Sequence, residues 1–388
     1  MEPSRILTAV PICDGHDSAI NTINLELIRH GFEVIYLGFH RSARDIARAA
    51  VQEDVQALGI STYNGGHVEF FAELIRLLGD FGVGSEMVVF GGGGGTITRE
   101  DAEEMYRSGV DRIFFAGTPL AEIVSYVKTR IRRANAPLSE GVVDYRLARK
   151  ISEIEAKTAR ALNFSLVDRN CQVIGVTGPG GAGKTTLIDE LVRRFLRSRP
   201  VTDRLAILSH DPSVVGLGAL LGDRATMIYS QHDRVFVRSM ATRGQAGGLS
   251  PATGESLEAL VHSKEFAAVL IETVGIGQEA LPFGPQESWA DATVLVMPPD
   301  YGSRLQLQKI AMLEIADLVV LNKTDHRGAK TAWAEVNARV RSTLRQPKVI
   351  QTQANRHNDK GVDQLFDLLF SDTVSQISAQ PIPNTQIA

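Results

Sequence analysis

The fold is indicated most directly by the stretch GPGGAGKT at residues 178–185. It follows a short β-rich run, Gln172–Thr177, and precedes a stretch with helical periodicity, Thr186–Arg197. In such a loop the glycines let backbone N–H groups converge on phosphate oxygens, and the start of the helix adds a favourable dipole. A glycine-rich turn without a ligand would not need this strand–loop–helix context. The stretch therefore predicts a P-loop that binds the phosphates of a nucleotide.

Two side chains of the loop carry most of the expected chemistry. Lys184 is expected to bridge the β and γ phosphates and to act in catalysis, and Thr185 is expected to coordinate Mg²⁺. The remaining phosphate contacts are expected along the loop and the first helical turn, from Gly178, Gly181, Ala182, Gly183 and Thr186.

The string NKTD at residues 322–325 indicates the base of the nucleotide. It follows an apolar strand expected at Leu318–Leu321. A carboxylate at Asp325 can accept hydrogen bonds from N1–H and the 2-amino group of guanine, a pair of donors that adenine lacks. Downstream of a P-loop, Asn322, Lys323 and Asp325 therefore predict GTP as the nucleotide substrate.

Carboxylates between these two motifs are candidates for the magnesium site. Asp211 follows the expected strand Leu205–Ser209, Asp223 comes shortly after it, and Glu272 ends the strand Ala268–Glu272. Hard cations bind oxygen ligands, and strand ends that face a P-loop are where such ligands are needed. We expect Asp211 and Glu272 to act in catalysis with Lys184. Helix capping and turn formation are the alternative roles of Asp211 and Asp223.

The N-terminal third of the chain alternates short apolar stretches with amphipathic ones. Such alternation predicts parallel strands covered by helices on both faces of a sheet. The fold class is thus α/β, with a flavodoxin-like, Rossmann-like domain ahead of the P-loop domain and a ligand site at the switch point between its first and third strands. The strands of this first domain are expected at Arg5–Ile12, Glu33–Leu37, Ala57–Ser61, Met87–Phe90 and Arg112–Phe115.

A second candidate site lies at the carboxyl ends of these strands. Asp14 and His16 follow the first strand, Ser61 ends the third, and five glycines at residues 91–95 follow the fourth. A carboxylate that holds one ring nitrogen of a histidine fixes its tautomer and raises its basicity as a metal ligand. Glycines leave room for a flat, bulky group against the backbone. By itself, an Asp-x-His pair can also be a simple surface hydrogen bond.

Two other proteins with this layout fit the residues less well. A response-regulator receiver needs an aspartate at the end of the third strand, where Ser61 stands. A flavodoxin needs a Ser/Thr-rich phosphate loop after the first strand, where DGHDSA stands. His67 is either a polar residue at a helix start or a second ligand.

The strings DGHDSAIN, STYNGGHVE and VFGGGGG resemble the B12-binding domains of methylmalonyl-CoA mutase and methionine synthase, with their pattern DxHxxG, SxL and GG. Ala19 and Tyr63 depart from that pattern, and both departures resemble the fused isobutyryl-CoA mutases in particular. The resemblance implies that His16 is the lower axial cobalt ligand of adenosylcobalamin, with Asp14 as its carboxylate partner. It further implies that the cofactor is contacted by Ser61, Tyr63, Gly91 and Gly92.

The second half of the chain resembles the G-protein chaperones of cobalamin-dependent acyl-CoA mutases. The resemblance is carried by DPS at 211–213, LGDR at 221–224, RSMATRG at 238–244, ETVG at 272–275 and NKTD at 322–325. It implies Mg²⁺ ligands at Thr185, His210 (through its backbone carbonyl), Asp211, Asp223, Glu272 and Thr273. Thr226 stands where many relatives have an arginine near the nucleotide. Residues 238–248 and 272–278 are expected to be loops that respond to the γ-phosphate.

From these motifs we expect four segments. A cobalamin-binding domain spans 1–134, a helical linker 135–165, a P-loop GTPase domain of the G-protein chaperone type 166–371 and a disordered tail 372–388. Further strands of the GTPase domain are expected at Thr293–Met297 and Val349–Thr352.

Composition excludes several other classes of protein. The 388 residues include 41 basic and 45 acidic side chains, so no basic field predicts a nucleic-acid partner. Cys13 and Cys171 are the two cysteines and lack CxxC spacing, which argues against a disulfide scaffold or a zinc–cysteine site and favours the cytoplasm. The N-terminus has no long apolar run, so neither a signal peptide nor a membrane partner is expected.

Two functions stay open at this point. Fused isobutyryl-CoA mutases continue into an acyl-CoA-binding (β/α)₈ barrel, which needs about 250 residues. The resemblance therefore implies a mutase large subunit as partner, or a missing C-terminal barrel, and a homodimer. One function is an adenosylcobalamin-binding, GTP-hydrolysing chaperone component of an acyl-CoA mutase. The other is a non-catalytic cobalamin carrier or sensor that GTP switches.

Overall fold

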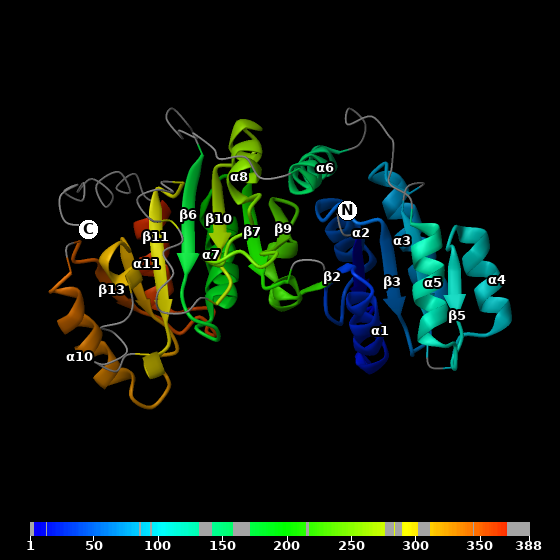
Figure 1. The fold of residues 1–388 in the computed structure, drawn as a ribbon, viewed down its shortest axis with the longest axis horizontal. Coiled ribbons are helices and arrows are strands. Elements are labelled where there is room, and N and C mark those ends of the chain that lie inside the picture. The colour runs from blue at the N-terminus through cyan, green and yellow to red at the C-terminus, as the bar shows by residue number, and fades with distance from the viewer. Residues whose placement is uncertain are drawn as a thin grey trace. The chain divides into compact units, whose positions relative to one another are not determined.

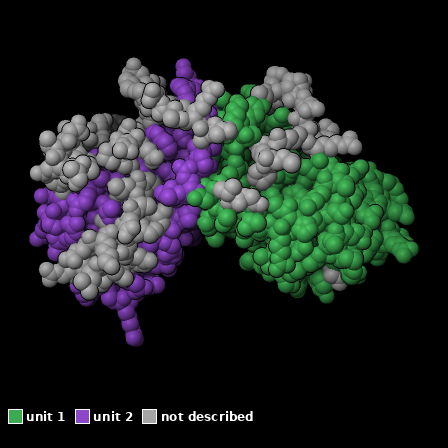
Figure 2. All heavy atoms as spheres, viewed as in Figure 1, with its two compact units in different colours: residues 1–161, 211–226, 237–244 green, residues 162–210, 227–236, 245–388 purple. Residues whose placement is uncertain are grey.

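The chain forms two compact units (Figure 2), and its strands form two β-sheets. The first comprises residues 1–161, 211–226 and 237–244, and the second comprises residues 162–210, 227–236 and 245–388. The computed structural model describes residues 4–12, 14–84, 87–93, 95–131, 142–157, 171–214, 217–275, 283, 289–301, 311–343 and 345–370.

The first unit is built on a six-stranded parallel sheet in the order β5-β4-β3-β1-β2-β8 (Figure 1). Its five N-terminal strands have the flavodoxin-like order that the sequence predicts, with the switch point between β1 and β3. The strands are β1 (Arg5–Ala9), β2 (Glu33–Tyr36), β3 (Ala57–Ser61), β4 (Val88–Gly92), β5 (Arg112–Phe114) and β8 (Ala219–Leu221).

Both faces of this sheet are buried. Ile6 and Leu7, consecutive residues of β1, enter two different apolar clusters, as alternation along a strand requires. One cluster includes Phe71 and Leu74 of α3, and the other includes Ile123 of α5. The helices of the unit are α1 (Ser18–Arg29), α2 (Ala43–Gln52), α3 (His67–Asp80), α4 (Arg99–Ser108), α5 (Leu120–Arg130) and α6 (Val143–Ala156).

The sixth strand, β8, was not predicted. It comes from the sequence that follows the P-loop, yet it pairs in parallel with β2 at the edge of the first sheet. Gly218 makes the approach possible, because a Cβ there would lie 2.3 Å from the carbonyl oxygen of Phe32. With three residues, and Leu220 44% exposed, β8 carries too little apolar alternation to be recognised from sequence.

The second sheet has seven strands in the order β13-β12-β11-β6-β10-β7-β9. Its strands are β6 (Gln172–Thr177), β7 (Leu205–Asp211), β9 (Val235–Ala241), β10 (Ala268–Glu272), β11 (Ala292–Met297), β12 (Leu318–Leu321) and β13 (Lys348–Gln351). The α-helices of the second unit are α7 (Lys184–Ser198), α8 (Thr253–His262), α10 (Ala329–Val340) and α11 (Lys360–Phe370). Short 3₁₀ turns are η1 (Asp223–Thr226), in the first unit, and η2 (Tyr229–Gln231), η3 (Pro299–Tyr301) and η4 (Ala311–Glu314).

Two expectations about connecting segments need comment. Residues 238–241 were expected in a loop that responds to the nucleotide, but they form the second half of β9. The expected helical connector contains α6, while residues 132–141 and 158–170 lie outside the described residues, as does the tail 372–388. Within the described part of the chain, no helix has both the length and the hydrophobicity needed to cross a bilayer.

Candidate functional site

The loop after β1 places Asp14 and His16 in direct contact. Oδ1 of Asp14 lies 2.7 Å from Nδ1 of His16 and also accepts the backbone N–H of His16 at 2.9 Å. Oδ2 of Asp14 accepts the backbone N–H groups of Tyr63 and Asn64, which follow β3. Because both oxygens of Asp14 are engaged, the carboxylate ties the loop after β1 to the loop after β3.

These contacts favour the ionised form of Asp14 and one tautomer of the neutral His16 ring. Burial alone would raise the pKa of the Asp14 carboxyl, but hydrogen bonds from His16, Tyr63 and Asn64 outweigh it and lower that pKa below its usual range. An ionised Asp14 can only accept, so Nδ1 of His16 is the donor and Nε2 carries the lone pair. The Asp14 residue is 1% exposed, whereas the His16 side chain is 63% exposed. The His16 side chain therefore lies exposed at the carboxyl edge of the sheet, held through Nδ1.

A cavity of about 370 Å³ opens at the same edge of the first sheet. Ser61 and Gly91–Gly93 line it at the ends of β3 and β4, and Thr22 and Thr118 are two further lining residues that carry hydroxyl groups. The rest of its wall is mainly apolar and comes from α1, β4, β5 and α5: Ile20, Ile23, Phe90, Phe114, Leu120 and Ile123. The cavity is mainly apolar and lies at the sheet edge where open parallel sheets bind ligands. Tyr63 is not among its lining residues; its ring lies 4.8 Å from the ring of His16.

The glycines after β4 are needed by the protein itself. A Cβ on Gly91 would lie 2.4 Å from Cζ of Phe71, and one on Gly92 would lie 2.7 Å from the carbonyl oxygen of Phe114. A Cβ on Gly93 would meet the carbonyl oxygen of Thr62. Glycine is therefore required here for close packing, in addition to any room that it leaves for a ligand.

The P-loop of the second unit has the backbone that its sequence predicts. Gly178, Gly181 and Gly183 have φ values of +143°, +73° and +86°, a region that side chains disfavour. A Cβ on Gly178 would lie 2.0 Å from the carbonyl oxygen of Val296 in β11. Nζ of Lys184 donates to the carbonyl oxygens of Gly178 and Pro179, over 3.1 and 3.3 Å. The lysine thus lies along the loop that would hold the phosphates, with Thr186 exposed beside it in the first turn of α7.

Three oxygen-bearing side chains meet where β10 ends. Oγ1 of Thr185 donates to Oε1 of Glu272 over 2.6 Å, and Oγ of Ser209 donates to Oε2 over 3.3 Å. Nδ1 of His210 donates to the backbone carbonyl of Glu272 over 2.7 Å, which fixes the strand end. Thr273 follows the strand, and its hydroxyl donates to that of Thr177 over 3.0 Å.

The other expected magnesium ligands, Asp211 and Asp223, belong to the first unit. The carbonyl oxygen of Asp211 accepts the N–H of Thr242 at 3.1 Å, and Asp223 begins η1. Thr226 is exposed, and its hydroxyl caps the Asp223 carbonyl over 2.9 Å. In the part of the chain that the structure describes, no three His, Cys, Asp or Glu side chains are grouped to hold a metal ion. A magnesium site would therefore be built around the Thr185–Glu272 pair.

The NKTD string lies directly after β12. Nδ2 of Asn322 donates to the carbonyl oxygen of Ala182 in the P-loop over 2.9 Å, and its Oδ1 accepts from the Thr352 hydroxyl and the Ala354 N–H. Lys323 has a φ of +58°, and Asp325 is exposed. Asn322 thus holds the P-loop and the loop after β13 together, while the Asp325 carboxylate faces solvent and can accept hydrogen bonds from a base.

Comparison with known proteins accounts for both halves of this arrangement. A family model described as methylmalonyl Co-A mutase-associated GTPase MeaB matches residues 147–378, and a model described as B12 binding domain matches residues 4–124. The chain belongs to the methylmalonyl-CoA mutase-associated GTPase family. It is a GTPase of the MeaB type that carries a B12-binding domain, so cobalamin and GTP are the ligands of its two domains.

Curated relatives of this GTPase match either nearly the whole chain or about half of it. It is 37% identical over 386 residues to the fused isobutyryl-CoA mutase of Cupriavidus metallidurans, covering 93% of this chain and 35% of that protein. It is 38% identical over 393 residues to that of Nocardia farcinica, covering 95% and 36%. A putative GTPase of Pyrococcus abyssi is 37% identical over 206 residues, covering 51% of this chain and 61% of that protein. The chain spans about a third of the length of the fused mutases that it matches.

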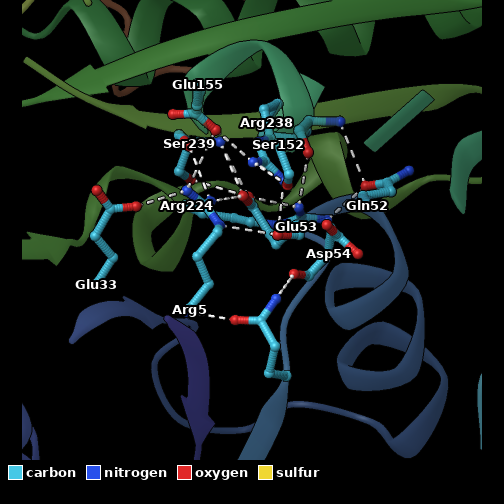
Figure 3. A network of polar contacts seen from close by, with 12 residues as sticks. Arg5, Glu33, Gln52, Glu53, Asp54, Ser152, Glu155, Arg224, Arg238 and Ser239 are labelled. Atoms are coloured by element: carbon cyan, nitrogen blue, oxygen red, sulfur yellow. Dashed lines mark hydrogen bonds and ion pairs between the residues drawn. The ribbon is translucent and has the colours of Figure 1, made fainter. Parts of the chain in front are cut away.

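The structure adds a buried ionic network that the sequence did not predict (Figure 3). Arg238 in β9 pairs with Glu155 of α6 over 2.5 Å, and Arg224 in η1 pairs with Glu53 after α2 over 3.1 Å. Arg5 of β1 pairs with the same Glu53 over 2.7 Å. These side chains are at most 4% exposed. The MeaB-type segments 221–224 and 238–244 are thus anchored in the first unit by charge pairs.

Proposed function

We propose that this MeaB-type GTPase is the cobalamin-binding and GTP-hydrolysing chaperone component of a B12-dependent acyl-CoA mutase. The cofactor is adenosylcobalamin, and the reaction it serves is a carbon-skeleton isomerisation of the isobutyryl-CoA or methylmalonyl-CoA type. The observation that carries the proposal is the Asp14–His16 pair, with its outward nitrogen, beside an apolar cavity in a chain that also has a P-loop. The likeness to fused isobutyryl-CoA mutases supports it.

On the cobalamin side, His16 binds the cobalt through Nε2, and Asp14 holds the ring in the tautomer that leaves this nitrogen free. Ser61, Gly91 and Gly92 line the cavity that takes the nucleotide tail, and Tyr63 packs on the His16 ring. When bound, the cofactor supplies a cobalt–carbon bond whose homolytic cleavage generates a radical. The apolar wall of the cavity excludes water from the tail.

On the nucleotide side, Thr185 and Glu272 hold Mg²⁺, together with Asp211, Asp223, Thr273 and the carbonyl of His210. Lys184 contacts the β and γ phosphates, and Asp325 binds the guanine base. The 2.6 Å contact of Thr185 with Glu272 supports the first pair, since both groups offer oxygen to a hard cation. Lys184, Asp211 and Glu272 stabilise the charge that develops during phosphoryl transfer.

The wider organisation is also part of the proposal. The cobalamin-binding domain spans 1–134, the linker 135–165, the P-loop GTPase domain of the G-protein chaperone type 166–371 and the tail 372–388. The partner is an acyl-CoA-binding mutase subunit or barrel, and the chain acts as a homodimer in the cytoplasm. The fused architecture of its relatives supports the barrel, and the two cysteines among 388 residues support a reducing compartment.

Nucleotide-dependent binding of the cofactor tests this function. Adenosylcobalamin is titrated into the protein loaded with GDP or with a non-hydrolysable GTP analogue, each with and without an acyl-CoA-binding barrel. A chaperone that gates the cofactor must bind it with different affinity in the two states, by about 5–150-fold. Identical dissociation constants and rates in all four conditions would overturn the proposal. In parallel, His16→Ala is expected to replace the spectrum of histidine-ligated cobalamin with that of a base-off or unbound form.

A further inference from the structure

The end of strand β10 is held by a buried histidine. Nδ1 of His210 donates to the backbone carbonyl of Glu272 over 2.7 Å, and Nε2 lies 2.9 Å from Oγ1 of Thr253, at the start of α8. The His210 residue is 1% exposed, and Glu272 and Thr253 are buried as well. A buried imidazole costs free energy unless its nitrogens find partners, and here both nitrogens have one. All of these residues belong to the second unit.

The residue that His210 holds is the one that meets the first turn of α7. Glu272 is the last residue of β10, and its pairing with Ser209 is the last pair of the β7–β10 ladder. Its side chain accepts from Thr185 through Oε1 and from Ser209 through Oε2. With His210 on the carbonyl, contacts fix both the carboxylate and the main chain of Glu272. A main chain that turned at this point would carry the carboxylate away from Thr185.

The loop that precedes α8 is fastened to the same strand end. The hydroxyl of Thr253 donates to the carbonyl oxygen of Ser250 over 2.7 Å, which holds the loop against the residue that contacts His210. The N–H of Val274, two residues after β10, donates to the carbonyl oxygen of Gly248 over 3.0 Å. His210 is thus one member of a set of contacts that joins β7 and β10 to the start of α8.

We propose that the His210 side chain is a positioning residue for GTP hydrolysis and acts through the main chain of Glu272. The inference rests on the proposed function, in which the Glu272 carboxylate acts in hydrolysis. The backbone carbonyl of His210, proposed as an Mg²⁺ ligand, is retained by every substitution at this position. Loss of an outer contact that orients a functional group costs about 10–100-fold in activity, and a misplacement of about 1 Å can cost as much.

The test compares His210→Asn with His210→Gln. The amide nitrogen of asparagine can take the place of Nδ1 and donate to the Glu272 carbonyl, whereas the amide of the longer glutamine reaches toward Thr253 instead. In His210→Asn the kcat for GTP should stay near that of the unchanged protein. In His210→Gln it should fall by about 10–100-fold, while KM changes by less than about threefold. A glutamine variant as active as the unchanged protein, or an equal loss in both variants, would overturn the inference.

A double variant separates a positioning role from a purely structural one. If His210 acts through Glu272, adding His210→Gln to Glu272→Gln should lower the rate by no more than about twofold, because the carboxylate is already gone. Losses that multiply independently would overturn the inference. Val336→Ala is the control for stability, because it removes an apolar contact of α10 in the same unit and should leave hydrolysis unchanged. The fluorescence of Trp289 and Trp333 checks that the second unit is folded in each variant.

Amide hydrogen exchange, measured without nucleotide, separates this inference from the proposed function. The N–H groups of Thr273 and Val274 directly follow Glu272 and donate to backbone carbonyl oxygens of neighbouring segments. Their exchange should be faster in His210→Gln than in the unchanged protein and in His210→Asn. Exchange that is the same in all three proteins would overturn the inference. A Glu272→Gln variant with the hydrolysis rate of the unchanged protein would instead overturn the proposed role of the carboxylate, and faster exchange in His210→Gln would then support the contact by itself.

Discussion

Oγ1 of Thr185 donates a hydrogen bond to Oε1 of Glu272 over 2.6 Å. The contact joins the first turn of α7 to the end of β10, two elements that the parallel pairing of β10 with β6 brings together. Gly275 extends the same junction, because a Cβ there would lie 2.5 Å from Cα of Gly180 in the P-loop. A hydroxyl and a carboxylate so placed can share one hard cation.

Thr185→Ala is expected to impair hydrolysis through loss of this metal ligand. The alanine cannot bind Mg²⁺, and stabilisation of transition-state charge by a metal is worth several kcal/mol, so the rate of GTP hydrolysis should fall by about 100-fold or more. Release of inorganic phosphate at saturating Mg²⁺ measures it. Thr185→Ser keeps the hydroxyl and should retain most of the rate; an alanine variant as active as the serine variant would contradict the assignment.

Asp14→Ala is expected to weaken cobalamin binding without affecting GTP hydrolysis in the absence of the cofactor. The change removes the acceptor of the His16 ring and of three backbone N–H groups, from His16, Tyr63 and Asn64. Loss of the partner that orients a metal-ligating histidine costs about 10–100-fold in affinity. Titration followed by absorption measures this. An affinity equal to that of the unchanged protein would show that His16 needs no such partner.

Asp325→Asn is expected to change the choice of base. The amide retains an acceptor for N1–H but presents a donor where the 2-amino group of guanine also donates, so GTP binding should weaken. Xanthosine triphosphate should bind more tightly than before, because its 2-oxo group accepts a hydrogen bond from the amide. The ratio of hydrolysis rates for the two nucleotides measures the switch, with ATP as the control that should be poor for both proteins. Equal use of ATP and GTP by the unchanged protein would refute the guanine assignment.

The strands that could be predicted from sequence are those with unbroken apolar runs. β3, β6, β10 and β12 begin and end where the pattern predicts. Each is a central strand or nearly so, buried on both faces, and such strands are rich in Val, Ile and Leu. Strand β9 was not predicted, because Arg238 interrupts its apolar pattern. A buried arginine is tolerated only with a partner, and its partner Glu155 lies 83 residues earlier in the chain.

Some contacts of the candidate cobalamin site could likewise be predicted from the sequence, and others could not. The contact of Asp14 with His16 follows from their spacing of two residues in one loop, so it could be predicted. The contacts of Asp14 with the N–H groups of Tyr63 and Asn64 could not be predicted. Every residue except proline has a backbone N–H, so the residue type does not show which of them donates to Asp14. In the second unit, the contact of His210 with the Glu272 carbonyl spans 62 residues and also uses a backbone group, which explains why no local pattern indicates it.

Arg238 and Glu155 should be strongly coupled in stability. Removing one partner of a buried pair costs about 3–5 kcal/mol where the other charge is left unpaired, and removing both costs less than the two single changes together. Removal of Arg238 should cost less than this range, because Arg5 and Arg243 also lie near the Glu155 carboxylate, at 3.9 and 3.7 Å. The double variant should therefore lower the stability of the first unit by less than the sum of the effects of Arg238→Met and Glu155→Gln. Both tryptophans, Trp289 and Trp333, belong to the second unit, so their fluorescence reports only that unit. Hydrogen exchange in β1 and β2 under increasing urea reports the first; strictly additive effects would contradict the coupling.

Acid should destabilise the first unit through Glu155. Burial alone would raise the pKa of this carboxyl, but the charges of Arg238, Arg5 and Arg243 outweigh burial and hold the pKa below its ordinary value of 4.5. A lowered pKa in the folded state means that the unfolded chain takes up the proton first as the pH falls. The contribution of Glu155 to stability is thus fully present above pH 4.5 and declines below it, until the folded carboxyl is protonated as well.

Exchange of the β1 amides measured from pH 6 to about pH 3, corrected for the intrinsic rate, should show this decline in the unchanged protein. In Glu155→Gln the decline should be shallower, although the variant is less stable at pH 6, because glutamine cannot take up the proton. Parallel curves for the two proteins would show that Glu155 is not the source of the acid sensitivity.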